Sequence, residues 1–228
     1  MILGGTFDMI RFAAAGLILL SAGAASAQSR DSLAVGVNAG TPGAGVQIEA
    51  RFGPIFVLRG GVETLGYDFD ASYDDVDYGG RFDFDTVSGF IDLHPLANAF
   101  TISGGAYLGP REIGLDATPS APVNLGGQTF TPAQVGTLSG KIKLKDVAPY
   151  IGLGFDNTFT GSSRWGIRAT AGVAWSEKPE VTLDSSGGTL SNDPAFRARL
   201  AQEAASIQSD AEDYGLFPVV QLGLNYRF

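Results

Sequence analysis

The chain has 228 residues, with 32 glycines, 11% aromatic residues and a formal net charge of −9. This composition, without a long apolar segment after residue 27, is typical of one domain made of many strands and turns. The acidic balance argues against nucleic acid as a partner, because phosphate binding needs clustered Lys and Arg. Zero cysteines exclude disulfides and thiolate metal sites.

An apolar run at residues 12–22 follows Arg11 and precedes Ala25-Ser26-Ala27, a small-residue cleavage pattern. The run is too short for a membrane span, so residues 1–27 are predicted to be a secretory signal peptide. Residues 1–10 carry Asp8 and no base, which favours Met9 as the true start of translation. A buried N-terminal helix is the alternative, but no polar face accompanies the run. Residues 28–228 are then the exported domain.

Alternation of apolar and polar residues recurs along the exported part and predicts eight strands. They cover residues 33–40, 46–52, 56–63, 77–93, 100–115, 138–155, 164–175 and 214–228. In the fourth strand Tyr78, Phe82 and Phe84 are expected to face outward before the apolar phase shifts. One-residue bulges near Asp85 and Asp146 would explain the phase shifts in the fourth and sixth strands. An even strand number allows an antiparallel sheet to close into a barrel.

The connections between these strands are unequal in length. Three of the four on one side are long, at residues 68–76, 116–137 and 176–213, whereas those on the other side are short. Long outward loops and short inner turns are typical of membrane β-barrels, and aromatic residues near the strand ends suit the two membrane interfaces. A soluble β-sandwich is the alternative.

The final strand has an apolar residue at every second position and ends on an aromatic one. Its apolar face comprises Val220, Leu222, Leu224, Tyr226 and Phe228. It resembles the terminal strand of bacterial outer-membrane β-barrels, which serves in that family as the signal for the barrel-assembly machinery. The resemblance therefore implies that this machinery is a partner during biogenesis.

From residue 32 to residue 228 the pattern resembles small eight-stranded outer-membrane barrels of the OmpA, OmpX and OmpW types. The glycine-rich segments 38–43 and 148–154 and the ending Tyr226-Arg227-Phe228 carry this likeness. It implies an all-β, closed antiparallel transmembrane barrel in the outer membrane of a Gram-negative bacterium, in contact with its lipids and lipopolysaccharide. It also implies a non-enzymatic structural or adhesion role, or the admission of small hydrophobic compounds.

The polar faces of the strands should line the barrel interior. The predicted lumen residues are Glu49, Arg51, Arg59, Glu63, Asp83, Asp85, Lys141, Lys143, Arg168 and Arg227. An eight-stranded barrel has room only for side chains or one small ligand, and buried charges must be paired. At least one Arg-Glu pair is therefore expected among the first four residues. An ion-pair network that plugs the lumen is the leading interpretation, and a narrow channel or transporter for small, hydrophobic solutes is the alternative.

One predicted outer loop is strongly acidic. It contains Asp68, Asp70, Asp74, Asp75 and Asp77. Oxygen ligands of this type suit calcium, but the spacing matches no EF-hand, so a solvated loop is favoured over a metal site.

One short amphipathic helix is predicted at residues 194–208, between the last two strands. It starts at Asp193-Pro194, and Phe196, Leu200, Ala204 and Ile207 share one face. It is expected to cap the barrel mouth or to lie against the outer interface, with a partner-binding helix as the alternative.

No catalytic residues and no cofactor are predicted. His94 is the single histidine and falls in a predicted inner turn, away from the long loops. Nucleophilic catalysis needs a base within hydrogen-bond reach of the nucleophile. The sequence therefore favours a non-enzymatic barrel.

Overall fold

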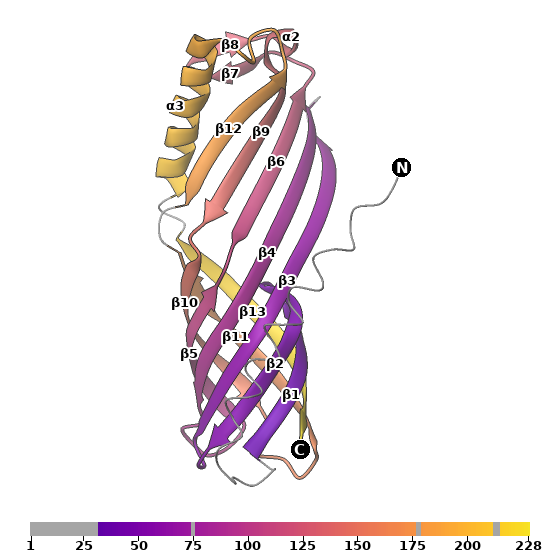
Figure 1. The fold of residues 1–228 in the computed structure, drawn as a ribbon, viewed down its shortest axis with the longest axis vertical. Helices are drawn as coiled ribbons and strands as arrows, with labels where there is room; N and C mark the ends of the chain where they lie inside the picture. The colour runs from indigo at the N-terminus through magenta and orange to yellow at the C-terminus, as the bar shows by residue number, and fades with distance from the viewer. Residues whose placement is uncertain (1–31, 74–75, 177–178, 212–214) are drawn as a thin grey trace.

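The computed structural model describes residues 32–73, 76–176, 179–211 and 215–228, so the predicted signal peptide lies outside the described residues. Eight antiparallel strands close into a barrel (Figure 1), which confirms the predicted fold class. In order around the wall they are β1 (Leu33–Gly40), β2 (Gly43–Phe52), β3 (Phe56–Tyr73), β4 (Val76–Leu93), β5 (Phe100–Leu108), β10 (Val147–Asp156), β11 (Trp165–Trp175) and β13 (Leu216–Arg227). The barrel closes where β13 pairs with β1.

On one side the wall continues far beyond the barrel. The upper halves of β3 and β4 join β6 (Arg111–Pro119), β9 (Gly136–Leu144) and β12 (Glu180–Gly187) in a five-stranded sheet, which we call the extension. A hairpin of β7 (Val123–Leu125) and β8 (Gln128–Phe130), the short helix α2 (Pro132–Val135) and the helix α3 (Pro194–Ala211) complete it. The three long connections predicted as loops are thus largely strand and helix.

The strands pass from the barrel into the extension without a change of register. β3 and β4 pair without interruption from Phe56↔Leu93 to Tyr73↔Val76. From Val87↔Leu108 to Phe84↔Arg111, β4 and its partner strand each move by three residues, so neither strand has an extra residue. The same holds from Leu108↔Val147 to Arg111↔Leu144. The ladder is interrupted at Pro110, which has no N–H to donate. The predicted bulges near Asp85 and Asp146 are therefore wrong.

The apolar residues of β4 change phase because the outer face of the wall is apolar in the barrel but polar in the extension, while aromatic residues occupy the inner face of the extension. Within the barrel the outer side chains of β4 are apolar, as at Val87 and Ile91, which are 41% and 58% exposed. In the extension the same face carries Asp83, while the inner face carries Phe82 and Phe84. The prediction that Tyr78, Phe82 and Phe84 face outward is wrong, because the outer face of the extension is polar and its aromatic side chains lie on the inner face.

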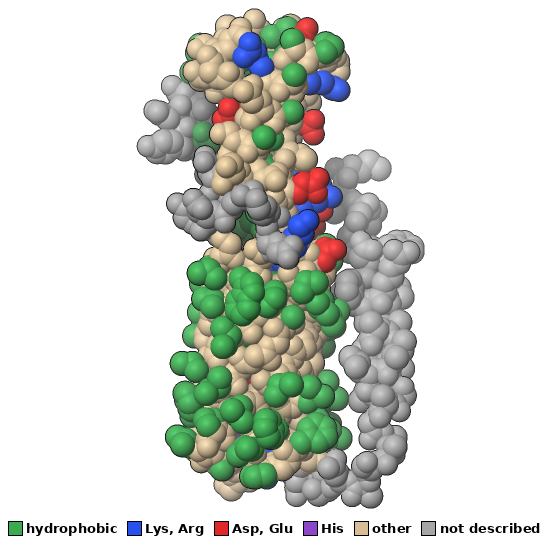
Figure 2. Space-filling view, turned by 90° about the vertical axis from the view of Figure 1, so that its left-hand side faces the viewer, with side chains coloured by type: hydrophobic (Ala, Val, Ile, Leu, Met, Phe, Trp, Pro, Cys, Tyr) green, Lys and Arg blue, Asp and Glu red, His purple; other side chains and the backbone are tan. Residues whose placement is uncertain are grey.

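The outer surface of the barrel forms an apolar belt. Figure 2 shows two bands of hydrophobic side chains across the visible face of the barrel, with charged side chains gathered beyond the upper band. At the lower end Trp165, Tyr226 and Phe228 stack edge to face, with ring centroids 5.1 and 5.8 Å apart. Aromatic residues of this kind are typical of a membrane–water interface. None of the helices in the described ranges is long and apolar enough to cross a membrane.

The predicted helix exists as α3 and begins at Pro194, where Asp193 Oδ1 accepts a hydrogen bond from the Phe196 N–H at 2.9 Å. Its buried residues Phe196 and Leu200 pack with Phe130 and Val135 in the core of the extension. The prediction that this helix caps the barrel mouth or lies at the outer interface is wrong. Its apolar face instead covers the inner face of the extension beside β12.

A charge introduced into the belt tests this assignment of faces. Ile151 lies at the middle of β10 and is 52% exposed, so Ile151→Arg should destabilise the barrel in lipid vesicles by roughly 2–4 kcal/mol in urea titrations. Asp116→Arg, on the same face but in the extension, is the control and should leave the urea midpoint unchanged. Equal effects of the two substitutions would contradict a membrane boundary between them.

Candidate functional site

The barrel interior is organised around one guanidinium. Arg168 on β11 donates from Nε to Glu49 Oε1 at 2.9 Å, and from Nη2 to Asp92 Oδ2 at 2.8 Å and Asp156 Oδ2 at 2.7 Å. All four side chains are at most 1% exposed. One cation thus holds three carboxylates from β2, β4 and β10.

A second arginine shares one of these carboxylates. Arg59 donates from Nε and Nη2 to the two oxygens of Asp92 at 3.0 and 3.3 Å, and its guanidinium lies 4.0 Å from the centroid of the Phe90 ring. Ser103 Oγ also donates to Asp92. Asp92 therefore links both buried arginines into one network.

The expected Arg-Glu pair among Glu49, Arg51, Arg59 and Glu63 is not formed. Glu49 and Arg59 are register partners on neighbouring strands, yet Arg59 pairs with Asp92 while Glu49 pairs with Arg168 across the lumen. That expectation is wrong, because pairing in a narrow barrel crosses the lumen as well as joining neighbouring strands.

Amide and hydroxyl groups extend the network to the lower end of the barrel. Asn225 Nδ2 donates to Glu49 Oε1 at 3.0 Å and to Thr158 Oγ1 at 2.9 Å. Phe159 follows in the β10–β11 turn and packs inside the wall against Ala34 and Val57. The side chain of Phe159 therefore reaches from this turn into the lower end of the lumen.

An aromatic layer lies above the charges. Phe90, Tyr107 and Tyr150 meet edge to face with centroids 5.1 to 5.9 Å apart, and the partly buried Phe217 packs against their cluster. From Phe217 a line of rings 6.0 to 6.3 Å apart continues along the inner face of the extension. It runs through Phe84, Phe82, Phe69 and Tyr67. The interior thus changes from ionic to aromatic along the barrel axis.

Four of the predicted lumen residues are buried inside the barrel, namely Glu49, Arg59, Glu63 and Arg168. Two more lie at its lower rim. Arg51 donates to the carbonyl oxygen of Phe159 at 2.8 Å, and Arg227 donates to those of Gly161 and Ser163 at 3.3 Å.

The other four predicted lumen residues, Asp83, Asp85, Lys141 and Lys143, lie on the outer face at or above the barrel rim. Lys141 and Lys143 form exposed ion pairs with Glu112 at 3.2 and 3.4 Å, and their hydrogen bonds hold the pKa of Glu112 below its usual range. Placing these four in the lumen was wrong, because the polar face of a strand faces outward once the strand leaves the apolar belt.

Two residues of the network, Asp92 and Asp156, were missing from the predicted set. Each lies in the inward phase of its strand, between outward Ile91 and Leu93 or after outward Phe155. Strict alternation would have found both.

The acidic segment behind the calcium hypothesis is only partly described. Asp68 accepts a hydrogen bond from Arg81 Nε at 2.7 Å, which raises the pKa of Arg81, and Asp70 lies on the same exposed face. Asp74 and Asp75 lie outside the described residues, as does the side chain of Asp77. Within the part of the chain that is described, no three Asp, Glu, His or Cys side chains gather as a metal site would require.

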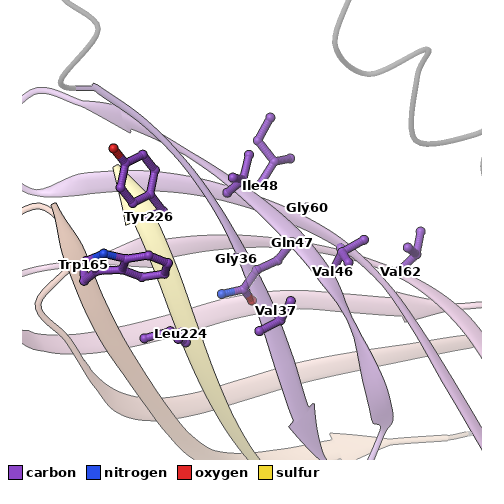
Figure 3. Close-up of a pocket in the computed structure, with 12 residues that line it drawn as sticks. Gly36, Val37, Val46, Gln47, Ile48, Gly60, Val62, Trp165, Leu224 and Tyr226 are labelled. Atoms are coloured by element: carbon purple, nitrogen blue, oxygen red, sulfur yellow. The ribbon is translucent and has the colours of Figure 1, made fainter. Parts of the chain in front are cut away.

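An apolar groove of about 580 Å³ lies on the outer face of β13, β1, β2 and β3. Figure 3 shows Val37, Val46, Val62 and Leu224 around Gly60, with Trp165 and Tyr226 at one end. The groove belongs to the apolar belt, while the interior side chains behind it, such as Gln47, are buried. The groove is therefore a feature of the outer surface of the barrel.

His94 is buried at the β4–β5 turn, where Nδ1 lies 2.7 Å from the carbonyl oxygen of Asn98. Ser88 lies well inside the barrel and donates to Glu63.

These features define a small eight-stranded antiparallel β-barrel with a buried ion-pair network and an apolar exterior. In solved structures the same fold occurs in CarO and CarO2 of Acinetobacter baumannii, with TM-scores of 0.61 and 0.62 and sequence identities of 23% and 22%. The alignments cover 86% of this chain and 97% and 98% of those chains. Both are small eight-stranded outer-membrane β-barrels, so the predicted resemblance is confirmed at the level of the fold.

A third structure, Ail of Yersinia pestis, aligns over 86% of this chain and 97% of its own, at 13% identity and a TM-score of 0.38. A likeness this distant supports no conclusion. No protein-family model matches the chain. No curated protein matches it significantly.

Proposed function

We propose that the protein is a non-enzymatic outer-membrane barrel with a closed lumen, whose role is structural or lies in contacts made by the extension. Removal of residues 1–27 after export would deliver the barrel to the outer membrane of a Gram-negative bacterium. The barrel-assembly machinery would read β13 there, and lipids and lipopolysaccharide would surround the apolar belt. One observation carries the closed lumen: Arg168 and its three carboxylates are at most 1% exposed.

The extension supports the surface role. Its outer face carries charges of both signs, including Asp68, Arg81, Glu112 and Lys141, and α3 and the β7–β8 hairpin pack on its inner face at β9 and β12. A rigid, charged sheet held above an apolar belt is accessible to macromolecules outside the cell. Because the β1–β2 turn is short, the extension rises from one side of the barrel only (Figure 1).

Conductance in planar lipid bilayers tests the closed lumen. The purified, refolded protein should leave the current at the baseline of the protein-free membrane, because the aromatic layer, the ionic layer and the Phe159 side chain follow one another along the axis. A known porin inserted into the same bilayer is the positive control. Discrete conductance steps that scale with salt concentration would contradict the closed lumen.

The line of rings from Tyr67 to Phe217 favours a second candidate function, the capture of small hydrophobic solutes. It leads from the extension to the aromatic layer of the barrel. Such solutes carry no current, so a fluorescent apolar probe bound to the protein in lipid nanodiscs is the appropriate readout. Saturable binding that Phe82→Ala abolishes and Leu216→Ala, on the exposed outer surface, preserves would favour this function over a purely structural one.

A further inference from the structure

The barrel contains a buried carboxylate with no cationic partner. Glu63 is 3% exposed, and its Oε1 accepts hydrogen bonds from Ser88 Oγ at 2.8 Å and Asn38 Nδ2 at 3.3 Å. Its Oε2 is buried without a partner. Arg59 and Arg168 are engaged by Asp92, Glu49 and Asp156, and among the described residues no basic nitrogen lies within 4.0 Å of Glu63.

Further oxygens without partners share its row. Asn38, Gly45, Glu63 and Thr86 are successive register partners across β1, β2, β3 and β4. Asn38 Oδ1 and Thr86 Oγ1 are buried and, like Glu63 Oε2, have no hydrogen-bond partner within 3.5 Å. Gly45 contributes no side chain between Asn38 and Glu63. Three strands thus present unpartnered oxygens to the same level of the lumen.

Glycine also makes room for Glu63 on its own strand. A Cβ atom at Gly61 would lie 2.7 Å from Glu63 Oε1 and 2.9 Å from Ser88 Oγ. The absence of that side chain lets both oxygens occupy this position.

The charged groups buried inside the barrel include more carboxylates than guanidiniums. Among the described residues, Glu49, Glu63, Asp92 and Asp156 are buried there together with two guanidiniums, those of Arg59 and Arg168. A third buried arginine, Arg111, begins β6 at the mouth and donates to the carbonyl oxygen of Lys145. Buried charges require compensation, and Glu63 has the neutral donors Ser88 and Asn38 but, among the described residues, no basic nitrogen within 4.0 Å.

We propose that a monovalent metal cation the size of Na⁺ or K⁺ is bound in the lumen by Glu63 Oε2, Asn38 Oδ1 and Thr86 Oγ1. Hard oxygen ligands select cations of this type over transition metals. A single carboxylate among neutral oxygens favours a monovalent ion, because Ca²⁺ sites generally combine several carboxylates with six to eight oxygen ligands. The ion satisfies the unpartnered oxygens and the surplus charge together.

The test compares salts during refolding, because the closed lumen would hinder exchange afterwards. Protein refolded in NaCl or KCl should have a higher urea midpoint than protein refolded in choline chloride of equal ionic strength, since choline is too large for the site. At a cation concentration ten times the Kd, the unfolding equilibrium constant should change about 11-fold. Glu63→Gln should abolish the difference, whereas Glu112→Gln, which removes an exposed carboxylate, should preserve it.

Two results would overturn the proposal. Equal midpoints in the three salts would exclude a cation. The second result has two parts: the Glu63→Gln protein is as stable as the wild type in every salt, and the wild type loses stability as the pH rises. Together they would show that Glu63 carries a proton instead. Crystals grown in rubidium chloride provide an independent readout, with an anomalous peak expected beside Glu63 and its absence counting against the site. Baseline conductance is compatible with either outcome, so the two proposals fail separately.

Discussion

Replacement of Arg168 by Met should cost the barrel about 3–5 kcal/mol of unfolding free energy, because breaking a buried pair leaves uncompensated charge. Without the guanidinium, Glu49, Asp92 and Asp156 would remain together in a dry interior, each at most 1% exposed. Urea titration in lipid vesicles measures the loss. The double replacement Arg168→Met with Asp156→Asn should cost less than Arg168→Met alone, since it removes one of the stranded charges.

Arg81→Met provides the matched control. Arg81 also pairs with an aspartate at 2.7 Å, but both partners are about 70% exposed, and water and salt screen such a pair. This variant should unfold at the wild-type midpoint. If Arg168→Met also unfolded at the wild-type midpoint, the interior would have to be hydrated. That result would favour a channel over a closed lumen.

Removal of the aromatic end of β13 should block assembly while leaving export intact. β13 pairs with both β1 and β11, and the Phe228 N–H donates to the Leu33 carbonyl at 3.1 Å, so this strand closes the wall. With Tyr226→Ala and Phe228→Ala together, the protein should accumulate in the periplasm and be degraded there, because the unclosed sheet exposes unpaired edges. The heat-modifiable band of outer-membrane fractions on gels measures the folded amount.

Leu216→Ala is the control for position. Leu216 lies at the opposite end of the same strand and is 67% exposed, so its loss removes apolar surface without touching the terminal signal. Its outer-membrane level should stay normal. Normal levels of the Tyr226 and Phe228 variant as well would refute a signal in the terminal residues.

The barrel strands could be predicted from the sequence because each one separates an apolar environment from a crowded polar one. β2 shows this most clearly, with exposed Val46 alternating with buried Gln47 and Glu49. The extension could not be predicted in the same way. At β9 and β12 its apolar face packs against α3 and the β7–β8 hairpin, and the sequence of β12 alone does not indicate which distant segment it meets.

Alternation also located four of the buried charged residues but could not pair them. Whether Glu49 meets Arg59 or Arg168 depends on side-chain length across the lumen, which a one-dimensional pattern does not contain. The misplaced residues Asp83 and Lys141 have a different cause. A one-residue bulge would shift the alternation of apolar residues in β4. A change from an apolar to a polar surrounding of the outer face shifts it in the same way, and the unbroken register of β4 in the structure distinguishes the two.

That unbroken register has a consequence for how deep the protein sits. Since β3 and β4 stay paired without interruption from Phe56↔Leu93 to Tyr73↔Val76, the pairing between these two strands does not mark where lipid should end. On this wall the upper boundary of the apolar belt is set by the outward residues that are charged, beginning with Asp85 and Asp83. A pair of substitutions at that level, such as Asp85→Val with Asp83→Leu, would therefore raise the hydrophobic height of this wall without altering the fold. Barrels of this architecture could match bilayers of different thickness through surface composition alone.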